Sequence, residues 1–228
     1  MKTIIITGAS NGIGKVLAEK LRNKYHIINI DIIEKNIDKV AFHKCDLSNK
    51  FELLETIKKI KNSIDSLYAI INNAAKFTQK NISEQSIEEW ENIISINLTA
   101  PYILSKEFAE LLKKSKGHII NISSTRAIMS EEGTEAYSAS KGGISSLTHS
   151  LAISLSPEIK VNSITPGWIN VDKNYKPTKL DNEQHPTNRV GDAQDILDVV
   201  NFLLKNRGFI TASNFVVDGG MTKKMIYV

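Results

Sequence analysis

The stretch that decides the fold is Thr7-Gly8-Ala9-Ser10-Asn11-Gly12-Ile13-Gly14, which directly follows the apolar run at 4–6. Glycines suit a tight turn from a strand into a helix, because the backbone there must approach a ligand and the neighbouring chain closely. The first turn of such a helix has unpaired N–H groups and a partial positive charge, which attract a phosphate. The stretch therefore predicts a nucleotide-binding turn, with a purely structural glycine turn as the alternative. No Gly-Lys-Ser or Gly-Lys-Thr follows, which excludes a P-loop.

Apolar runs alternate with helix-spaced apolar residues along the rest of the chain. Strands are expected at 4–6, 25–30, 40–45, 67–71, 118–122, 160–164 and 215–217, and helices at 13–24, 51–60, 86–114 with a break at Pro101, 136–155 and 192–204. The strands are continuously apolar, which is typical of burial on both faces of a parallel sheet. This pattern predicts an α/β fold: one Rossmann-type, doubly wound parallel sheet of about seven strands with helices on both faces.

The length and composition agree with one globular domain over residues 1–228. Apolar residues make up 41% of the chain and charged residues 24%, which excludes a disordered chain, a collagen and a disulfide scaffold. The polar stretch 172–188 is expected to be a loop or lid within this domain rather than a boundary. The net charge of +4 is too small for a nucleic-acid-binding face, so the lysine clusters are interpreted as solvated helix surfaces.

The numbers of cysteines and histidines and the lengths of the apolar runs argue against a disulfide-bonded, a metal-binding and a membrane-spanning protein. The single cysteine, Cys45, allows no internal disulfide and suits a reducing compartment. The five histidines lack paired ligand spacing, so no metal site is expected. No apolar run is long enough to span a membrane, and the chain is expected to be cytoplasmic.

Asp31 ends the second predicted strand, 17 residues after Gly14. A carboxylate at this position accepts hydrogen bonds from the ribose hydroxyls of an adenosine and repels a 2′-phosphate. Ile32 follows it, and Asn11 occupies the turn position where a basic residue would bind that phosphate. These residues favour NAD over NADP; the alternative is that Asp31 only caps a turn.

A second group of polar residues follows the fifth predicted strand. Tyr137 and Lys141 are four residues apart at the start of a helix, so the phenol and the ammonium lie on one face. A nearby cation favours the phenolate and lowers the phenol pKa from about 10 toward neutrality, where the group can exchange protons. Ser124, 13 residues before Tyr137, is expected to reach the same point and to orient a carbonyl.

Taken together, these features resemble the short-chain dehydrogenase/reductase family in its classical form, over essentially the whole chain. The matching motifs, in the right order and spacing, are Thr7-Gly8-x-x-x-Gly12-x-Gly14, Asn72-Asn73-Ala74, Asn97, the set Ser124, Tyr137 and Lys141, and Pro166-Gly167. The resemblance implies that Tyr137 is the general acid/base and that Lys141 holds the nicotinamide ribose and lowers the Tyr137 pKa. It also implies that Ser124 positions the substrate oxygen and that Asn97 maintains a relay water.

The resemblance further implies a set of cofactor contacts. They are Gly8, Asn11, Gly12, Ile13, Gly14, Asp31, Asp46, Leu47, Asn73, Ala74, Ala75, Tyr137, Lys141, Pro166, Gly167 and Ile169. Asp46 and Leu47 are expected beside the adenine, and Pro166, Gly167 and Ile169 beside the nicotinamide. Two positions depart from the family pattern: Ala75 replaces a usual glycine, and Val171 stands where a threonine often contacts the cofactor. Ala75 adds a methyl group close to the cofactor, and the hydrogen bond lost at Val171 is expected to weaken binding without abolishing it.

The function expected from this resemblance is NAD-dependent hydride transfer between the nicotinamide and a secondary alcohol or ketone. The short polar loop 172–188 favours a small polar substrate such as a sugar or polyol. Two alternatives stay open: an NADP-linked reductase of 3-oxoacyl groups on an acyl carrier, and a catalytically idle NAD-binding regulator.

A homodimer or homotetramer is expected, pairing partly through the helices at 102–114 and 137–155, although Ile144, Leu147 and Leu151 fit the core equally well. Trp168 is expected either in the wall of the substrate pocket or in plain packing, and Glu131 and Glu132 either at its entrance or in a solvated turn.

Overall fold

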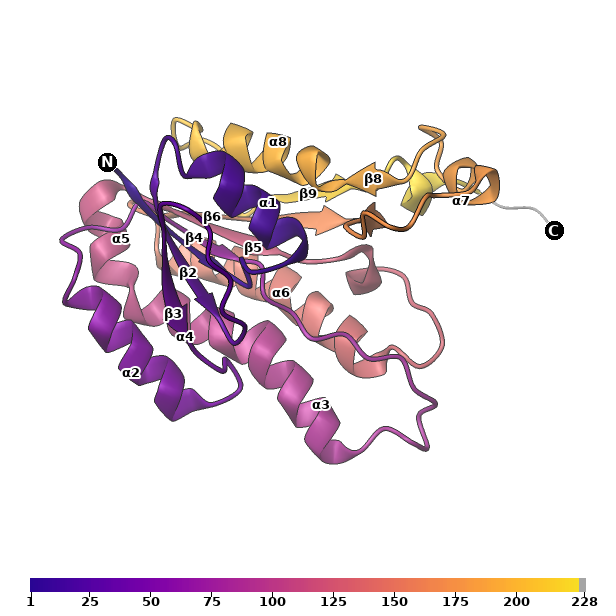
Figure 1. The fold of residues 1–228 in the computed structure, drawn as a ribbon, viewed down its shortest axis with the longest axis horizontal. Helices are drawn as coiled ribbons and strands as arrows, with labels where there is room; N and C mark the ends of the chain where they lie inside the picture. The colour runs from indigo at the N-terminus through magenta and orange to yellow at the C-terminus, as the bar shows by residue number, and fades with distance from the viewer. Residues whose placement is uncertain (226–228) are drawn as a thin grey trace.

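The computed structural model describes residues 1–225, which are built around one seven-stranded sheet (Figure 1). The strand order is β3-β2-β1-β4-β5-β6-β9, and every neighbouring pair is parallel. The strands are β1 (Thr3–Thr7), β2 (His26–Asp31), β3 (Val40–Lys44), β4 (Ala69–Asn72), β5 (His118–Ile122), β6 (Lys160–Pro166) and β9 (Asn214–Val217). The prediction of a Rossmann-type doubly wound parallel sheet is confirmed.

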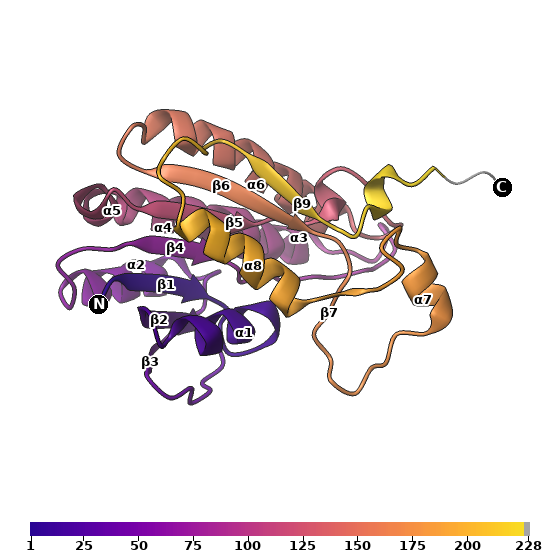
Figure 2. The same ribbon diagram turned by 90° about the horizontal axis from the view of Figure 1, so that it is seen from above.

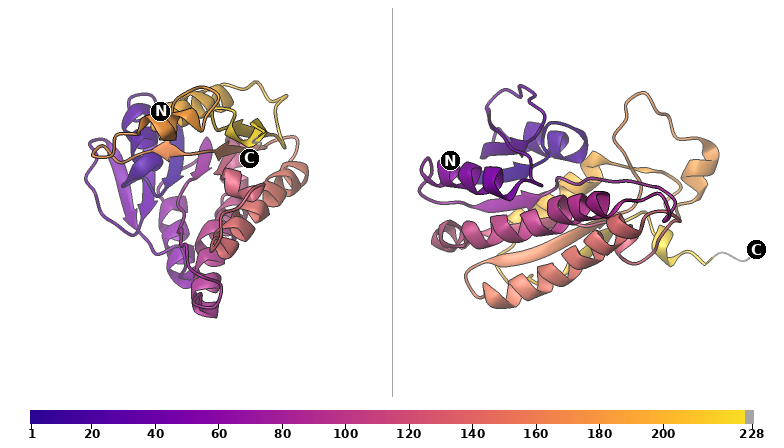
Figure 3. Two further views of the ribbon diagram at one scale, coloured as in Figure 1. Left: turned by 90° about the vertical axis from the view of Figure 1, so that its right-hand side faces the viewer. Right: turned by 90° about the horizontal axis from the view of Figure 1, so that it is seen from below.

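Helices cover both faces of the sheet (Figure 3). One face packs against α1 (Gly12–Leu21) and α8 (Ala193–Leu204), whose leucines share a core with Ile4 and Ile6 of β1. The other packs against α2 (Lys50–Lys61), α4 (Ala100–Glu107), α5 (Ala109–Ser115) and α6 (Glu135–Ser154). Burial on both faces explains why apolar residues stand at consecutive positions in strands such as β1, where 4–6 are all isoleucine.

The helical stretch 86–114 is divided differently from the prediction. A capping box between Ser86 and Glu89 starts α3 (Ile87–Ile94), which continues through a π-helical turn at Ser95–Thr99 into α4. Pro101 does not break the helix: it lies in the first turn of α4, directly after the π-helical turn. The break comes at Phe108, whose backbone (φ −94°, ψ 3°) separates α4 from α5.

The polar stretch 172–188 contains structure that its composition does not predict. A capping box between Thr178 and Asp181 starts the short helix α7 (Lys179–Glu183). Before and after this segment, β7 (Ile169–Asn170) pairs in parallel with β8 (Gly191–Asp192). In Figure 2, α7 stands beyond the carboxyl end of the main sheet.

Three apolar residues of α6 were expected either at a subunit interface or in the core, and they belong mainly to the core. Ile144 is 1% exposed and Leu151 is 9% exposed, and Leu147 packs partly against the same cluster. Among residues 1–225, no helix combines the length and apolarity that a membrane crossing requires.

The strand order places the polar residues of interest at one edge. The chain runs from β1 to β2 and β3 on one side and then returns to β4 on the other, so the order reverses between β1 and β4. In open parallel sheets, ligands bind outside the carboxyl ends of the strands at this reversal. The loops after β1, β4, β5 and β6 all open there.

Candidate active site

The turn after β1 is held by contacts that require glycine. Gly8 has φ +69°, and a Cβ on it would lie 2.8 Å from the Cα of Ala74. The Asn73 amide Nδ2 donates to the carbonyl oxygens of Thr7 (3.0 Å) and Gly8 (3.1 Å). Thr7 Oγ1 in turn accepts from the N–H groups of Asn73 and Ala74, each at 3.0 Å. The turn and the segment after β4 therefore form one hydrogen-bonded unit.

The start of α1 is open to a ligand. Asn11 stands at the N-cap without making a side-chain cap, and the first turn contains no acidic residue. Gly12 has φ +55°, and an added Cβ there would meet only Val171 Cγ2, at 3.9 Å. Free N–H groups, a helix dipole and empty space fit a pyrophosphate. The residues present therefore fit the phosphate group of a dinucleotide.

Asp31, at the end of β2, accepts hydrogen bonds on both carboxylate oxygens. Oδ2 accepts from the N–H of Ser10 at 2.9 Å, and Oδ1 accepts from the N–H of Ile33 at 3.0 Å. The carboxylate thus ties the glycine turn to the loop after β2. The same loop carries Lys35, whose ammonium donates to Asn11 Oδ1. Lys35 is not among the residues predicted from the sequence, because no spacing rule brings this exposed loop residue back to the turn.

The other predicted cofactor residues lie along the same edge. Asp46 follows β3, where its Oδ1 accepts from the N–H (2.9 Å) and hydroxyl (2.7 Å) of Ser48, and Leu47 packs partly against the core. Pro166 ends β6, and Gly167 lies so close to Asp218 that an added Cβ would be 2.7 Å from its Cβ. The remaining residues of the set are Ile13 and Gly14 in α1, Ala75 after β4 and Ile169 in β7.

Tyr137 and Ser124 meet at the carboxyl end of β5. Ser124 caps a 3₁₀ turn at Thr125–Ala127, where its Oγ accepts from the Arg126 N–H at 3.2 Å. Tyr137, in the first turn of α6, meets Phe77 edge-on with ring centroids 5.0 Å apart. Burial raises the pKa of Tyr137, while a hydrogen bond with Ser124 and the charge of Arg126 act in the opposite direction.

Lys141 lies one helical turn after Tyr137 and is 2% exposed. Its Nζ donates to the Ile122 carbonyl at 2.8 Å and lies 5.6 Å from the centre of the Tyr137 ring. Burial lowers the pKa of Lys141 to about 8. The ammonium is turned toward a backbone carbonyl, and Arg126 is a cation whose charge lowers the Tyr137 pKa. The effect of Lys141 on that pKa stays a prediction.

Asn97 lies in the π-helical turn, 1% exposed, and joins two parts of the site. Its Nδ2 donates to the Lys76 carbonyl and to Ser140 Oγ, each at 3.0 Å, and its Oδ1 accepts from the Lys76 N–H at 2.8 Å. The side chain therefore connects the segment after β4 to α6 beside Tyr137. A relay water at Asn97 stays a prediction.

The comparisons with known proteins agree with this geometry. A family model described as Enoyl-(Acyl carrier protein) reductase matches residues 8–222. The chain belongs to the short-chain dehydrogenase/reductase family. An uncharacterized oxidoreductase of Thermotoga maritima is 42% identical, covering 99% of this chain and 98% of its own. The 3-oxoacyl-[acyl-carrier-protein] reductase FabG of Buchnera aphidicola is 32% identical, covering 96% of this chain and 97% of its own.

A solved structure is also closely similar. The 4-hydroxyisoleucine dehydrogenase complexed with NADH has a TM-score of 0.91 and 31% sequence identity, and the match covers 99% of this chain and 100% of that one. As in other short-chain dehydrogenases/reductases, the fold here is a parallel sheet whose strand ends carry the polar residues of the site.

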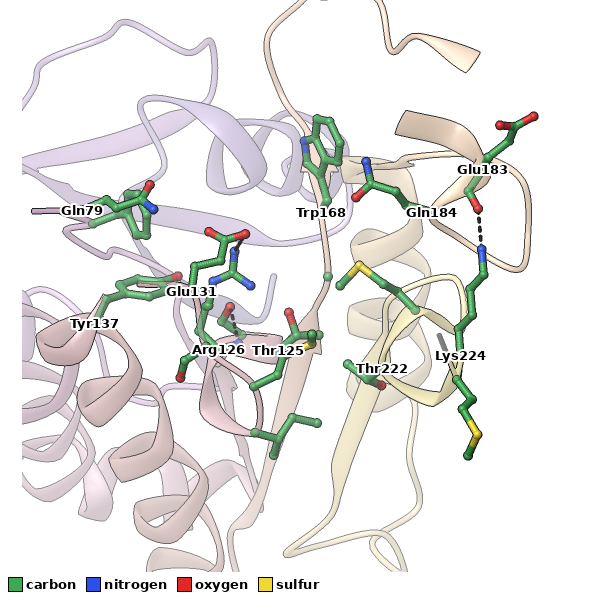
Figure 4. Close-up of a pocket in the computed structure, with 18 of the residues that line it drawn as sticks. Gln79, Thr125, Arg126, Glu131, Tyr137, Trp168, Glu183, Gln184, Thr222 and Lys224 are labelled. Carbon is green, nitrogen blue, oxygen red and sulfur yellow. Dashed lines mark hydrogen bonds and ion pairs between the residues drawn. The ribbon is translucent and has the colours of Figure 1, made fainter. Parts of the chain in front are cut away.

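In this short-chain dehydrogenase/reductase, a cavity of about 1250 Å³ opens beside Ser124 and Tyr137 (Figure 4). Its wall includes Trp168, which lies 6.1 Å from the Tyr175 ring and 6.3 Å from the His185 ring, so Trp168 both lines the cavity and packs. Glu131 also lines the cavity, whereas Glu132 contributes a carbonyl that accepts from Gln79 Nε2 at 3.1 Å.

Arg126 also lines this cavity and is not among the residues predicted from the sequence. It follows Ser124 by two positions and forms an ion pair with Glu131, Nη2 to Oε1 at 2.5 Å. Its place in a loop beside the proposed serine was the available signal. Among residues 1–225, no group of three or more His, Cys, Asp or Glu side chains is arranged to hold a metal ion.

Proposed function

We propose that the protein is an NAD-dependent dehydrogenase that interconverts a secondary alcohol and a ketone. One observation carries the proposal: Ser124 and Tyr137 line a cavity at the same sheet edge as the open glycine turn, with Lys141 buried one helical turn after Tyr137. An idle NAD-binding regulator has no need of this set, so its intact presence argues for an enzyme.

The bound nicotinamide supplies or accepts the hydride, and the chain supplies position and proton transfer. The N–H groups of Gly12, Ile13 and Gly14 at the start of α1 would hold the pyrophosphate, and Asp31 the adenosine ribose. Lys141, with one N–H on the Ile122 carbonyl, has others for the nicotinamide ribose.

Two hydroxyls of the chain have different roles at the reacting carbon. Ser124 Oγ donates a hydrogen bond to the substrate oxygen and so orients it. Tyr137 Oη takes the proton from an alcohol or returns it to a ketone. The raised Tyr137 pKa predicts that alcohol oxidation, which needs the phenolate, speeds up as pH rises.

The choice of NAD rests on Asp31, and Lys35 is the residue that opposes it. The Asp31 carboxylate lies against Ser10, where it would repel a 2′-phosphate, but the Lys35 ammonium on Asn11 would attract one. The relative complexed with NADH supports the first interpretation.

Titration of the protein with NADH and NADPH, followed by nicotinamide fluorescence, tests this choice. We expect NADH to bind at least about 10-fold more tightly, and Asp31→Ser to reduce the preference. Tighter binding of NADPH that is lost in Lys35→Ala would overturn the proposal.

For the substrate, we propose a small polar alcohol. Polar groups of Gln79, Glu131 and Gln184 line the cavity. A reductase of acyl-carrier ketones is the second candidate, because exposed Ile128, Met129 and Leu180 give the same cavity an apolar rim and the Buchnera aphidicola relative carries that name.

A substrate screen that follows the absorbance of the reduced nicotinamide separates these candidates. It covers sugars, polyols, steroids and acyl thioesters; activity confined to the bulky apolar members would refute the polar-substrate proposal. Tyr137→Phe should lower kcat by about 10²–10⁴-fold with cofactor binding retained. Tyr25→Phe, at the opposite end of the sheet, is the matched control; equal turnover in both variants would remove Tyr137 as the proton donor.

We also propose a cytoplasmic homodimer or homotetramer of single-domain chains. Tyr102 on α4 is 48% exposed and Ile153 on α6 is 76% exposed, which leaves apolar surface on the two helices predicted to pair. A single buried cysteine, Cys45, suits a reducing compartment.

A further inference from the structure

Arg126 places a cation in the wall of the cavity that Tyr137 faces. It stands on the 3₁₀ turn between Ser124 and α6, and its side chain is only 20% exposed. Figure 4 shows Arg126 and Glu131 side by side near Tyr137, whereas Glu183 and Lys224 lie on the far side of the cavity. A guanidinium withdrawn from water in this way needs acceptors for its N–H groups.

The pairing of Arg126 is incomplete by comparison with a second arginine of the chain. Arg189 donates two hydrogen bonds to Asp195, Nη1 to Oδ2 at 2.8 Å and Nη2 to Oδ1 at 2.5 Å. Arg126 contacts one carboxylate oxygen, Nη2 to Glu131 Oε1, whereas Arg189 contacts both oxygens of Asp195. Yet Arg126 is the more buried of the two, at 20% against 54% exposed. The planar guanidinium of Arg126 therefore has N–H groups available for a planar ligand with two oxygen atoms.

Glu131 can give up this contact at little cost. It lies in the exposed run 130–132, and its side chain is 54% exposed. Ion pairs with such an exposed partner contribute little free energy, because water competes for the carboxylate. The charged groups at the far side are otherwise engaged: Lys224 Nζ donates to the Glu183 carbonyl at 2.7 Å, and the Glu183 carboxylate pairs with Lys179.

We propose that the substrate carries a carboxylate, that Arg126 binds it, and that Glu131 occupies this site until the substrate displaces it. The alcohol group of this substrate rests on the proposed function, and the carboxylate is the new inference. The substrates would then be hydroxy acids and the corresponding oxo acids. In oxidation, the carbinol carbon gives its hydride to the nicotinamide and the hydroxyl gives its proton to Tyr137 Oη. The carboxylate is unchanged and serves only to bind.

Matched substrates test the assignment. 3-Hydroxybutyrate and 4-hydroxypentanoate are each compared with the corresponding carboxamide, which has the same shape and no charge. We expect kcat/KM to favour each acid by roughly 10- to 100-fold, as a charge-assisted pair would. Arg126→Gln should remove that preference, and Glu131→Gln, at an exposed position, should lower KM for the acids several-fold. Arg189→Gln removes an arginine outside the cavity and should leave the preference unchanged.

The ratio of acid to amide separates this role from an effect on Tyr137. Loss of the Arg126 charge raises the Tyr137 pKa, so Arg126→Gln should move the alkaline limb of the pH profile upward for acid and amide alike. Only carboxylate binding changes the ratio. If Arg126→Gln slows acid and amide equally, Arg126 acts through Tyr137 alone and the inference is overturned.

A binding measurement without turnover distinguishes failure of this inference from failure of the proposed function. Butyrate and butyramide are titrated against the fluorescence of Trp168 in a Trp90→Phe background, since these are the two tryptophans of the chain. We expect butyrate to quench, butyramide not to, and the response to vanish in Arg126→Gln. Quenching without turnover of any alcohol supports the carboxylate site and refutes the dehydrogenase. Turnover of amides and acids at equal kcat/KM, with no Arg126-dependent quenching, refutes the site and leaves the dehydrogenase.

Discussion

The glycine-turn side of the crevice (residues 7–14 and 73–75) is held by side-chain hydrogen bonds to the backbone and by close packing of the backbone. The cavity side (residues 126–132 and 180–184) is lined mainly by exposed side chains. On the first, Asn73 donates to two carbonyls and Gly8 touches Ala74. On the second, most residues are exposed and their contacts are ion pairs or caps at the surface. Substitutions should therefore change stability on the glycine-turn side and substrate selection on the cavity side.

The largest effect that tests this contrast is expected from Gly8→Ala. A side chain there would adopt φ +69° and lie 2.8 Å from Ala74 Cα, so we expect a loss of about 2–4 kcal/mol in the free energy of unfolding. Thermal unfolding should show a Tm lower by about 5–15 °C. Gly142→Ala, in a helix with the nearest atom 4.0 Å away, is the control and should stabilise slightly. Equal effects of the two substitutions would contradict the contrast.

A smaller effect is expected where the two sides meet, at Lys141. Burial lowers its pKa to about 8, so between about pH 8 and its unfolded pKa near 10.5 the unfolded chain binds the extra proton. The contribution of Lys141 to the free energy of unfolding therefore rises with pH across that window. Below about pH 8 the full cost of burying the charged ammonium lowers the stability. Urea unfolding at pH 7.5 and pH 10 should show the wild type gaining about 2 kcal/mol relative to Lys141→Met. A pH-independent difference between the two proteins would show that the ammonium is solvated.

The smallest effect compares one motif on two parts of the molecule. Ser86 and Thr178 both form capping boxes, on α3 and α7. Each cap contributes about 1 kcal/mol to its helix, so Ser86→Ala should lower Tm by about 2–4 °C. Because α7 buries no residue, Thr178→Ala should leave Tm unchanged and alter KM instead. A drop in Tm with Thr178→Ala would mean that α7 is part of the cooperative fold.

The fold followed from the sequence because its signals are local. Continuously apolar runs such as 4–6 identify a doubly buried parallel sheet, and Gly8 and Gly12 both adopt the positive φ that their turn demands. The division of the helix at 86–114 did not follow, since a π-helical turn depends on the side chain of Asn97 reaching Lys76 and Ser140 across the tertiary structure.

The site followed from the sequence only in part. Strand ends and helical spacing brought Ser124, Tyr137 and Lys141 to one place. The charges around them depend on which way long side chains turn: Lys141 toward the Ile122 carbonyl, Lys35 back to Asn11, and Arg126 into the cavity. Residue spacing does not contain this information.

The three hydrogen bonds of Asn97 have a consequence for timing. This one amide joins the segment after β4, which carries the predicted cofactor contacts 73–75, to α6, which carries the proposed proton donor Tyr137. A shorter or charged side chain at position 97 would lose these hydrogen bonds, so the two segments could move independently. The proposed hydride and proton transfers would then no longer occur together. For the proposed dehydrogenase, we expect the isotope effects of deuterium at carbon and deuterium in solvent to be expressed together in the parent and separately in such a variant.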